Sequence, residues 1–215
     1  MSDLPSAELK DIASSKDHDA RDNRIFVTRR FAEAVGELGL EGIAQFDGFY
    51  NSEFNDRSRA STYGVSFNER LIDSIPEEEA DRNLYHELQH VKNHAVEANH
   101  PDFQTMRKFI LAPDFLDLFK RMKAFYEVHK SRDYSFSKVI GGEPELGGFG
   151  FTYTESDELM ALLRGYERFI KQKEQNPQVR SEPYEFIGAF KPEDLKFLDF
   201  GYRVNLGRSV QAPTG

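Results

Sequence analysis

The segment PEEEADRNLYHELQHVKNHAVEAN, from Pro76 to Asn99, decides how this chain folds. Proline is tolerated at the first helical position, and the three glutamates after it fall in the first turn, where the helix dipole favours negative charge. The pattern predicts one long helix that ends just before Pro101. Its apolar residues share one stripe of the helix surface, which is expected to face the protein core: Leu84, Leu88, Val91 and Ala95.

The other face of this predicted helix carries the sequence His-Glu-Leu-Gln-His, from His86 to His90. Residues four positions apart on a helix lie about 40° apart around its axis and one turn along it, so both imidazoles can reach one ion. With His86 placed at zero, the apolar stripe falls between about 140° and 200°, on the opposite side. We therefore expect an active-site helix and not a pair of core histidines.

Two neutral imidazoles suit Zn²⁺, which takes nitrogen and oxygen ligands in a tetrahedron and keeps one position open in catalytic sites. Glu87 projects at a different angle and is expected to act as general base on a water molecule. Chance is one alternative, because the pattern occurs in about one chain in a hundred at ordinary residue frequencies. A purely structural zinc is the other alternative. The polar helix face argues against chance, and the glutamate between the histidines favours catalysis.

The His-Glu-x-x-His pattern, preceded by a predicted strand in residues 60–72, resembles the zincin metallopeptidases. The resemblance implies a mainly helical α+β domain with a small sheet, whose edge strand precedes the metal helix and binds the substrate backbone by strand addition. Tyr63 and Val65 are then the expected substrate-binding residues. Metzincins carry a third histidine ten positions after the first, and Val96 at that position excludes this branch.

The gluzincin branch takes its third metal ligand from a glutamate on a later helix, and residues 156–172 are predicted to form such a helix. Glu158 begins a Glu-x-x-Ala sequence that resembles small gluzincins, and it is the expected third ligand, with Glu155 and Asp157 as alternatives. These acids could instead cap the start of the helix. Leu162 stands where thermolysin-like members carry an aspartate, so the chain departs from that pattern.

The resemblance implies a zinc-dependent endopeptidase that hydrolyses peptide bonds of a protein substrate, with Glu87 as general base. Tyr166 is the expected stabiliser of the oxyanion, and three further tyrosines are alternatives: Tyr153, Tyr184 and Tyr202. A zincin scaffold that binds a protein or regulates it without cleavage is the alternative function, against which the intact Glu87 argues. Compact zincins with a polar N-terminal arm also resemble bacterial effector proteases that are injected into host cells.

Composition narrows the class of protein further. The 215 residues fit one domain, and the absence of cysteine excludes disulfides and cysteine-ligated zinc. A net charge of −9 argues against a nucleic-acid partner, which requires a basic face. No apolar run reaches the roughly 20 residues that span a bilayer, and no signal peptide is evident. We therefore expect a cytoplasmic protein, or one secreted without a cleavable signal peptide.

The remaining pattern divides the chain into a flexible arm (1–24), a single domain (25–202) and a flexible tail (203–215). Apolar periodicity predicts a helix within residues 24–43 that ends near Gly39 or Gly42, and further helices in residues 102–111 and 114–129. A second strand is expected near residues 149–153, and a short element near 191–199.

Overall fold

The computed structural model describes residues 23–53, 57–99, 108–110, 113–129, 150–180 and 185–199. This part of the chain is mostly helical with two small sheets, which confirms the α+β class. The predicted arm and tail lie outside it, apart from Asn23 and Arg24, which begin the first of the described helices. The elements follow in this order: α2 (Asn23–Leu38), β1 (Gln45–Tyr50), β2 (Ser58–Ala60), β3 (Gly64–Asn68), α3 (Glu69–Ile72), α4 (Glu77–Asn99), β4 (Lys108–Ile110), α6 (Pro113–His129), β5 (Gly150–Thr152), α8 (Tyr153–Gln175), η1 (Glu185–Ala189) and η2 (Pro192–Leu198).

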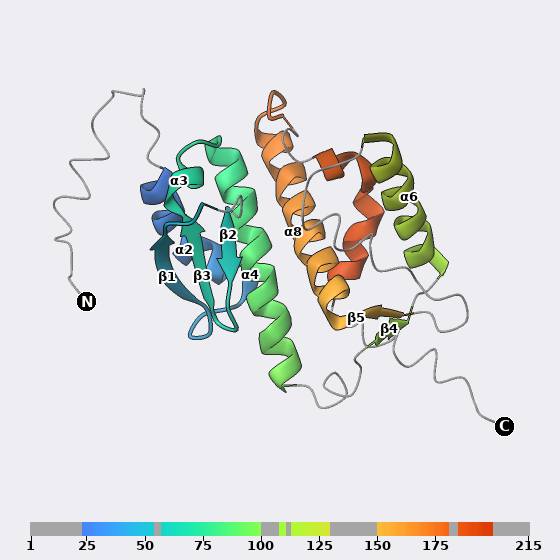
Figure 1. Cartoon of the computed structure of the whole chain (residues 1–215), viewed down its shortest axis with the longest axis horizontal. Coiled ribbons are helices and arrows are strands. Elements are labelled where there is room, and N and C mark those ends of the chain that lie inside the picture. The colour runs from blue at the N-terminus through green and yellow to red at the C-terminus, as the bar shows by residue number, and fades with distance from the viewer. Residues whose placement is uncertain are drawn as a thin grey trace, which may run out of the picture.

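Helix α4 runs through the middle of the molecule with α8 beside it, as Figure 1 shows. It confirms the helix predicted to follow Pro76. Leu84, Leu88 and Val91 are fully buried, so the predicted apolar stripe is the core face of this helix. This stripe belongs to a hydrophobic cluster with residues of α2 and β3. The opposite face of α4 is thereby left to meet α8.

Helix α2 ends at a glycine, as its sequence predicts. Gly39 has a φ of 67°, a left-handed conformation that glycine adopts without steric cost. The N–H of Leu40 donates to the carbonyl of Val35 at 2.9 Å, which satisfies a carbonyl of the last helical turn. The helix therefore ends at the first of the two glycines that the sequence offers, and β1 begins at Gln45.

The first sheet has the strand order β1-β3-β2, with β1 parallel and β2 antiparallel to β3. The predicted strand of residues 60–72 is therefore shorter than expected, and its core, β3, is the central strand. The prediction that it forms the edge is wrong. Val65 and Phe67 are fully buried under α4, while the three-residue β2 is the edge strand nearest that helix.

The C-terminal elements enclose a second hydrophobic cluster. Side chains from α6, α8, η1 and η2 form it, including Leu118, Leu163, Ile187 and Phe197. Helix α6 and strand β5 confirm the predictions for residues 114–129 and 149–153. The helix predicted for residues 102–111 is wrong at its end, because residues 108–110 form β4 and pair with β5. Residues 102–107 lie outside the described part.

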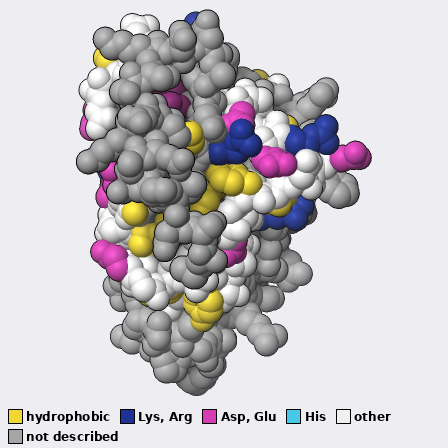
Figure 2. Space-filling view, turned by 90° about the vertical axis from the view of Figure 1, so that its left-hand side faces the viewer, with side chains coloured by type: hydrophobic (Ala, Val, Ile, Leu, Met, Phe, Trp, Pro, Cys, Tyr) yellow, Lys and Arg dark blue, Asp and Glu magenta, His cyan; other side chains and the backbone are white. Residues whose placement is uncertain are grey.

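Polar side chains join the two hydrophobic clusters where α4 meets α8. The carboxylate of Asp81 on α4 accepts from Arg168 and from Gln172 on α8, and from Arg30 on α2. Figure 2 shows the face at the left of Figure 1: among the described residues, charged side chains of both signs lie there and no histidine is visible. No helix in the described ranges is long and apolar enough to cross a membrane.

Candidate metal centre

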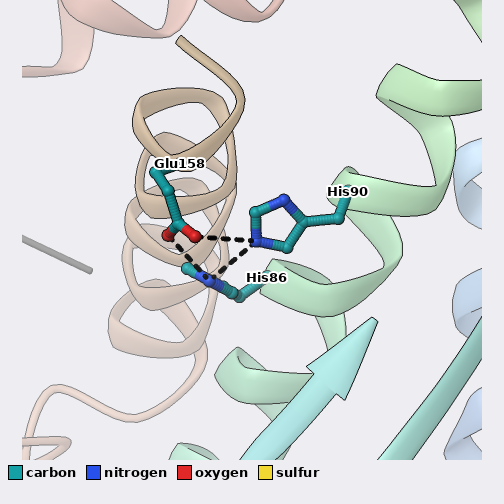
Figure 3. A group of neighbouring side chains, drawn as sticks. All are labelled: His86, His90 and Glu158. Carbon is teal, nitrogen blue, oxygen red and sulfur yellow. Dashed lines mark hydrogen bonds and ion pairs between the residues drawn. The ribbon is translucent and has the colours of Figure 1, made fainter. Parts of the chain in front are cut away.

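Three side chains that could hold a metal ion meet between α4 and α8 (Figure 3). His86 and His90 extend from successive turns of α4, and Glu158 extends towards them from the first turns of α8. Their side chains are 10 to 12% exposed, so bulk water has little access to the group. The structure therefore brings together the three residues that the sequence singled out, although Glu158 is 68 positions beyond His90.

The spacing of these ligand atoms fits one small cation. The Nε2 atoms of His86 and His90 are 3.3 Å apart. Two imidazole nitrogens on a tetrahedral zinc, each about 2.0–2.1 Å from the metal, are separated by about 3.3 Å. The oxygens of Glu158 lie 3.9 Å from the two Nε2 atoms, about half an ångström farther than that spacing requires. The two-nitrogen, one-oxygen donor set also matches the ligands that zinc prefers.

Asp157 holds His90 in place, a role that the sequence did not reveal. Its Oδ2 lies 2.6 Å from Nδ1 of His90, and its Oδ1 accepts from Nδ2 of Asn93 at 2.6 Å. Nδ1 is thus occupied, and Nε2 of His90 faces the other ligands. The sequence leaves Asp157 open as an alternative metal ligand, but these contacts make it the partner that orients one, as is common for metal-bound histidines.

Burial and the contact with Asp157 act in opposite directions on the pKa of His90. Burial lowers the pKa of this histidine, but the hydrogen bond and charge of Asp157 outweigh burial and raise the pKa to about 9. Glu87 and Glu158 contribute in the same direction as Asp157. For Asp157 the two effects have the opposite signs. Burial raises its pKa, but the contact with His90 outweighs burial, so the pKa of Asp157 is lowered. The carboxylates around the site thus create a negative potential that favours a cation.

Glu87 is buried and is held by the edge strand. The hydroxyl of Ser58, the first residue of β2, donates to Oε1 of Glu87 at 2.7 Å. Glu87 follows His86 directly on α4 and is close enough to act on the pKa of His90. A carboxylate in this position can accept a proton from a group that lies beside the histidines.

Tyr166 is not placed to stabilise an oxyanion at this site. It lies on α8 eight residues beyond Glu158, which is about 12 Å along the helix axis. Its ring packs against Phe190 at 5.5 Å within the C-terminal hydrophobic cluster. The expectation for Tyr166 is therefore wrong. The side chains of the alternative tyrosines lie outside the described residues: Tyr153, Tyr184 and Tyr202.

The two predicted substrate-binding residues also need correction. Val65 is fully buried, and its strand pairs on both sides, so neither its side chain nor its backbone can receive an added strand. Tyr63 is 46% exposed but precedes β3, and its carbonyl accepts from the N–H of Gln45 at 2.7 Å. The side chain of Glu155, the other alternative ligand, lies outside the described residues.

No family model matches this chain, and no curated protein or solved structure matches it significantly. The interpretation of the site therefore depends on its own contacts. They show a buried group of His86, His90 and Glu158 that could bind a metal ion. Asp157 contacts His90 of this group. Glu87 lies next to the group and accepts a hydrogen bond from Ser58 of the edge strand.

Proposed function

We propose that this protein is a zinc-dependent endopeptidase that hydrolyses peptide bonds of a protein substrate. The observation that carries the proposal is the convergence of His86, His90 and Glu158, with Glu87 beside them on the same helix as the histidines. Two histidines one turn apart on one helix and a glutamate from a later helix form a gluzincin-like ligand set. Zinc held there would polarise the scissile carbonyl and promote ionisation of water.

The protein side chains divide the remaining tasks. Glu87 takes a proton from the attacking water and later delivers it to the leaving amine, a role that typically contributes about 10²- to 10⁴-fold in rate. Ser58 donates to one oxygen of Glu87 and so fixes the direction of the carboxylate. Asp157 fixes the ring of His90. Burial of the ligand group excludes water that would otherwise weaken these contacts.

The edge strand favours a polypeptide as the substrate. Among the described strands β2 pairs only with β3, and an edge strand can bind an extended peptide through backbone hydrogen bonds. Because Ser58 of β2 contacts Glu87, a peptide added to β2 would pass the general base. The substrate would therefore lie along β2. The sequence pattern predicts a different position, along the strand that contains Val65.

Glu87→Gln tests the proposal. The amide has the same shape as the carboxylate, so zinc content and the melting temperature should stay near those of the parent, while cleavage of a quenched-fluorescence peptide library falls at least 100-fold. His94→Gln, on the same helix but outside the ligand group, is the matched control and should cleave like the parent.

Two results would count against the proposal. Equal cleavage by Glu87→Gln and the parent would remove Glu87 as the base. A zinc-loaded parent that cleaves no member of the library and no unfolded protein would favour the alternative, a scaffold that binds zinc and a protein partner without cleavage.

A further inference from the structure

The contact between Asp157 and His90 is the end of a longer chain of hydrogen bonds, of which all but the first are buried. Nε of Arg164 donates to Oε1 of Gln89 at 2.9 Å, and Nε2 of Gln89 donates to Oδ1 of Asn93 at 2.8 Å. Nδ2 of Asn93 then donates to Asp157 at 2.6 Å, and Asp157 meets Nδ1 of His90 at 2.6 Å. We call this chain the relay: Arg164, Gln89, Asn93, Asp157 and His90. It crosses between α4 and α8 three times.

The direction of the two amides in the relay is fixed at both ends, by Arg164 and by Asp157. A guanidinium has five N–H donors and no acceptor, so Gln89 must turn its oxygen to Arg164 and its NH₂ to Asn93. Asn93 must then accept through its oxygen, which turns its own NH₂ to Asp157. Asp157 is a carboxylate and only accepts, so Nδ1 of His90 is the donor to it whichever way the amides point.

We propose that Arg164 acts as a positioning residue that sets the direction of the two amides, so that Asn93 donates to Asp157 and holds its carboxylate against Nδ1 of His90. The inference rests on the zinc site of the proposed function and adds the means by which Asp157, the partner of one ligand, is itself held in place. A histidine protonated at Nε2 has no lone pair at that atom, so the wrong tautomer cannot bind metal through it.

Burial makes the relay decisive for His90. Gln89 is 2% exposed and Asn93 is 1% exposed, so water cannot replace a partner when an amide turns the wrong way. A reversed amide therefore places two donors or two acceptors against each other in a medium of low polarity, which costs far more than the same error at the surface.

Gln89→Glu is the sharpest single test, because it replaces one NH₂ by an oxygen. The new carboxylate would still accept from Arg164, but it could not donate to Asn93, so two acceptors meet somewhere between position 89 and Asp157. We expect the affinity for Zn²⁺, measured by competition with a chromophoric chelator, to fall about tenfold to a hundredfold. The added negative charge alone would favour a cation, so the sign of the change separates the two explanations.

A second substitution should restore the relay. In Asp157→Asn alone, the new NH₂ meets the NH₂ of Asn93 or the ring of His90, and zinc affinity should again fall about tenfold or more. In the double variant Gln89→Glu/Asp157→Asn, the amide of Asn93 can reverse and Nδ1 of His90 is again the donor. We expect the double variant to bind zinc more tightly than either single variant. If the losses of zinc affinity in the two single variants simply add in the double variant, the proposal is wrong.

Gln172→Glu is the matched control. Gln172 is buried in the same interface, accepts from Arg82 at 2.9 Å and donates to Asp81 at 2.8 Å, but it lies outside the relay. This variant should lose stability without loss of zinc affinity. If it weakens zinc binding as much as Gln89→Glu does, the effect is general disruption of the interface and the proposal is wrong.

The zinc-loaded parent offers a readout that requires no variant. Correlation of ring protons with ¹⁵N in histidine should show the proton of His90 on Nδ1, and a proton on Nε2 would overturn the relay. Zinc binding by the parent together with unchanged affinity in Gln89→Glu would overturn the relay and leave the metal site intact. A parent that binds no Zn²⁺ would overturn both.

Discussion

Removal of the Asp81 carboxylate tests whether charged side chains hold α4 against α2 and α8. The side chain of Asp81 is 4% exposed and accepts from Arg30 at 3.1 Å and from Arg168. The side chains of these arginines are only 13% and 15% exposed. Asp81→Ala would therefore leave two buried positive charges with one fewer partner each, and water has little room to take its place.

The expected loss of stability follows from what each arginine retains. Breaking a buried ion pair by removing one partner costs about 3–5 kcal/mol. Arg30 keeps Glu37 at 2.7 Å, and Arg168 keeps the ring of Tyr85 at 4.8 Å from its centroid. We therefore expect Asp81→Ala to lower the free energy of unfolding by about 3 kcal/mol, the low end of this range. That is a large fraction of the about 5–15 kcal/mol that ordinary domains possess.

Urea unfolding followed by circular dichroism, with a chelator present so that metal does not contribute, measures this change. Glu33→Ala is the matched control, because Glu33 pairs with the same Arg30 but is 69% exposed. It should cost at most about 1 kcal/mol. A loss below about 1 kcal/mol in Asp81→Ala, or equal losses in both variants, would refute the buried network as a source of stability.

Three further predictions concern the site and the fold. Zinc must displace a proton from His90, whose pKa is raised to about 9. Zinc affinity should therefore rise about tenfold per pH unit from pH 7 to 9 and then level off. Equal zinc affinity at pH 7 and 8.5 would contradict this prediction. Glu158→Ala should weaken zinc binding more than Asp157→Ala does, since one removes a ligand and the other its support; the reverse order in a chelator competition would exchange their roles. Gly39→Ala should lower the unfolding free energy by about 1 kcal/mol, because Gly39 has a φ of 67°, and an unchanged urea midpoint would show that the turn relaxes.

Local patterns carried the successful sequence predictions. Proline and three glutamates mark the start of α4, its apolar stripe is fully buried, and Gly39 ends α2. These signals depend on neighbours within one or two turns, so the sequence alone is sufficient. The expectation for Glu158 came from the resemblance to gluzincins, and the structure meets it because α8 carries this glutamate in its first turns and packs against α4.

Non-local pairing explains most of what the sequence did not reveal. Strand β2 has only three residues and no alternation to detect, although it provides the edge strand and Ser58. Strand β1 contains Gly48, where its register with β3 shifts. Asp157 gave no separate signal, because its partner His90 lies 67 positions away. The error at Tyr166 has a local cause and not a non-local one. The length of helix between Tyr166 and Glu158 was already sufficient to exclude Tyr166 as the stabiliser of the oxyanion.

The zinc content of the purified protein tests the central claim most directly. Elemental analysis should find about one zinc per chain in the parent and in the control His94→Ala, and little in His86→Ala or His90→Ala, because each of these removes one of three protein ligands. The melting temperatures of the chelated variants should stay close to that of the chelated parent, which separates loss of metal from loss of fold. The same zinc content in His86→Ala, His90→Ala and the parent would contradict the metal site.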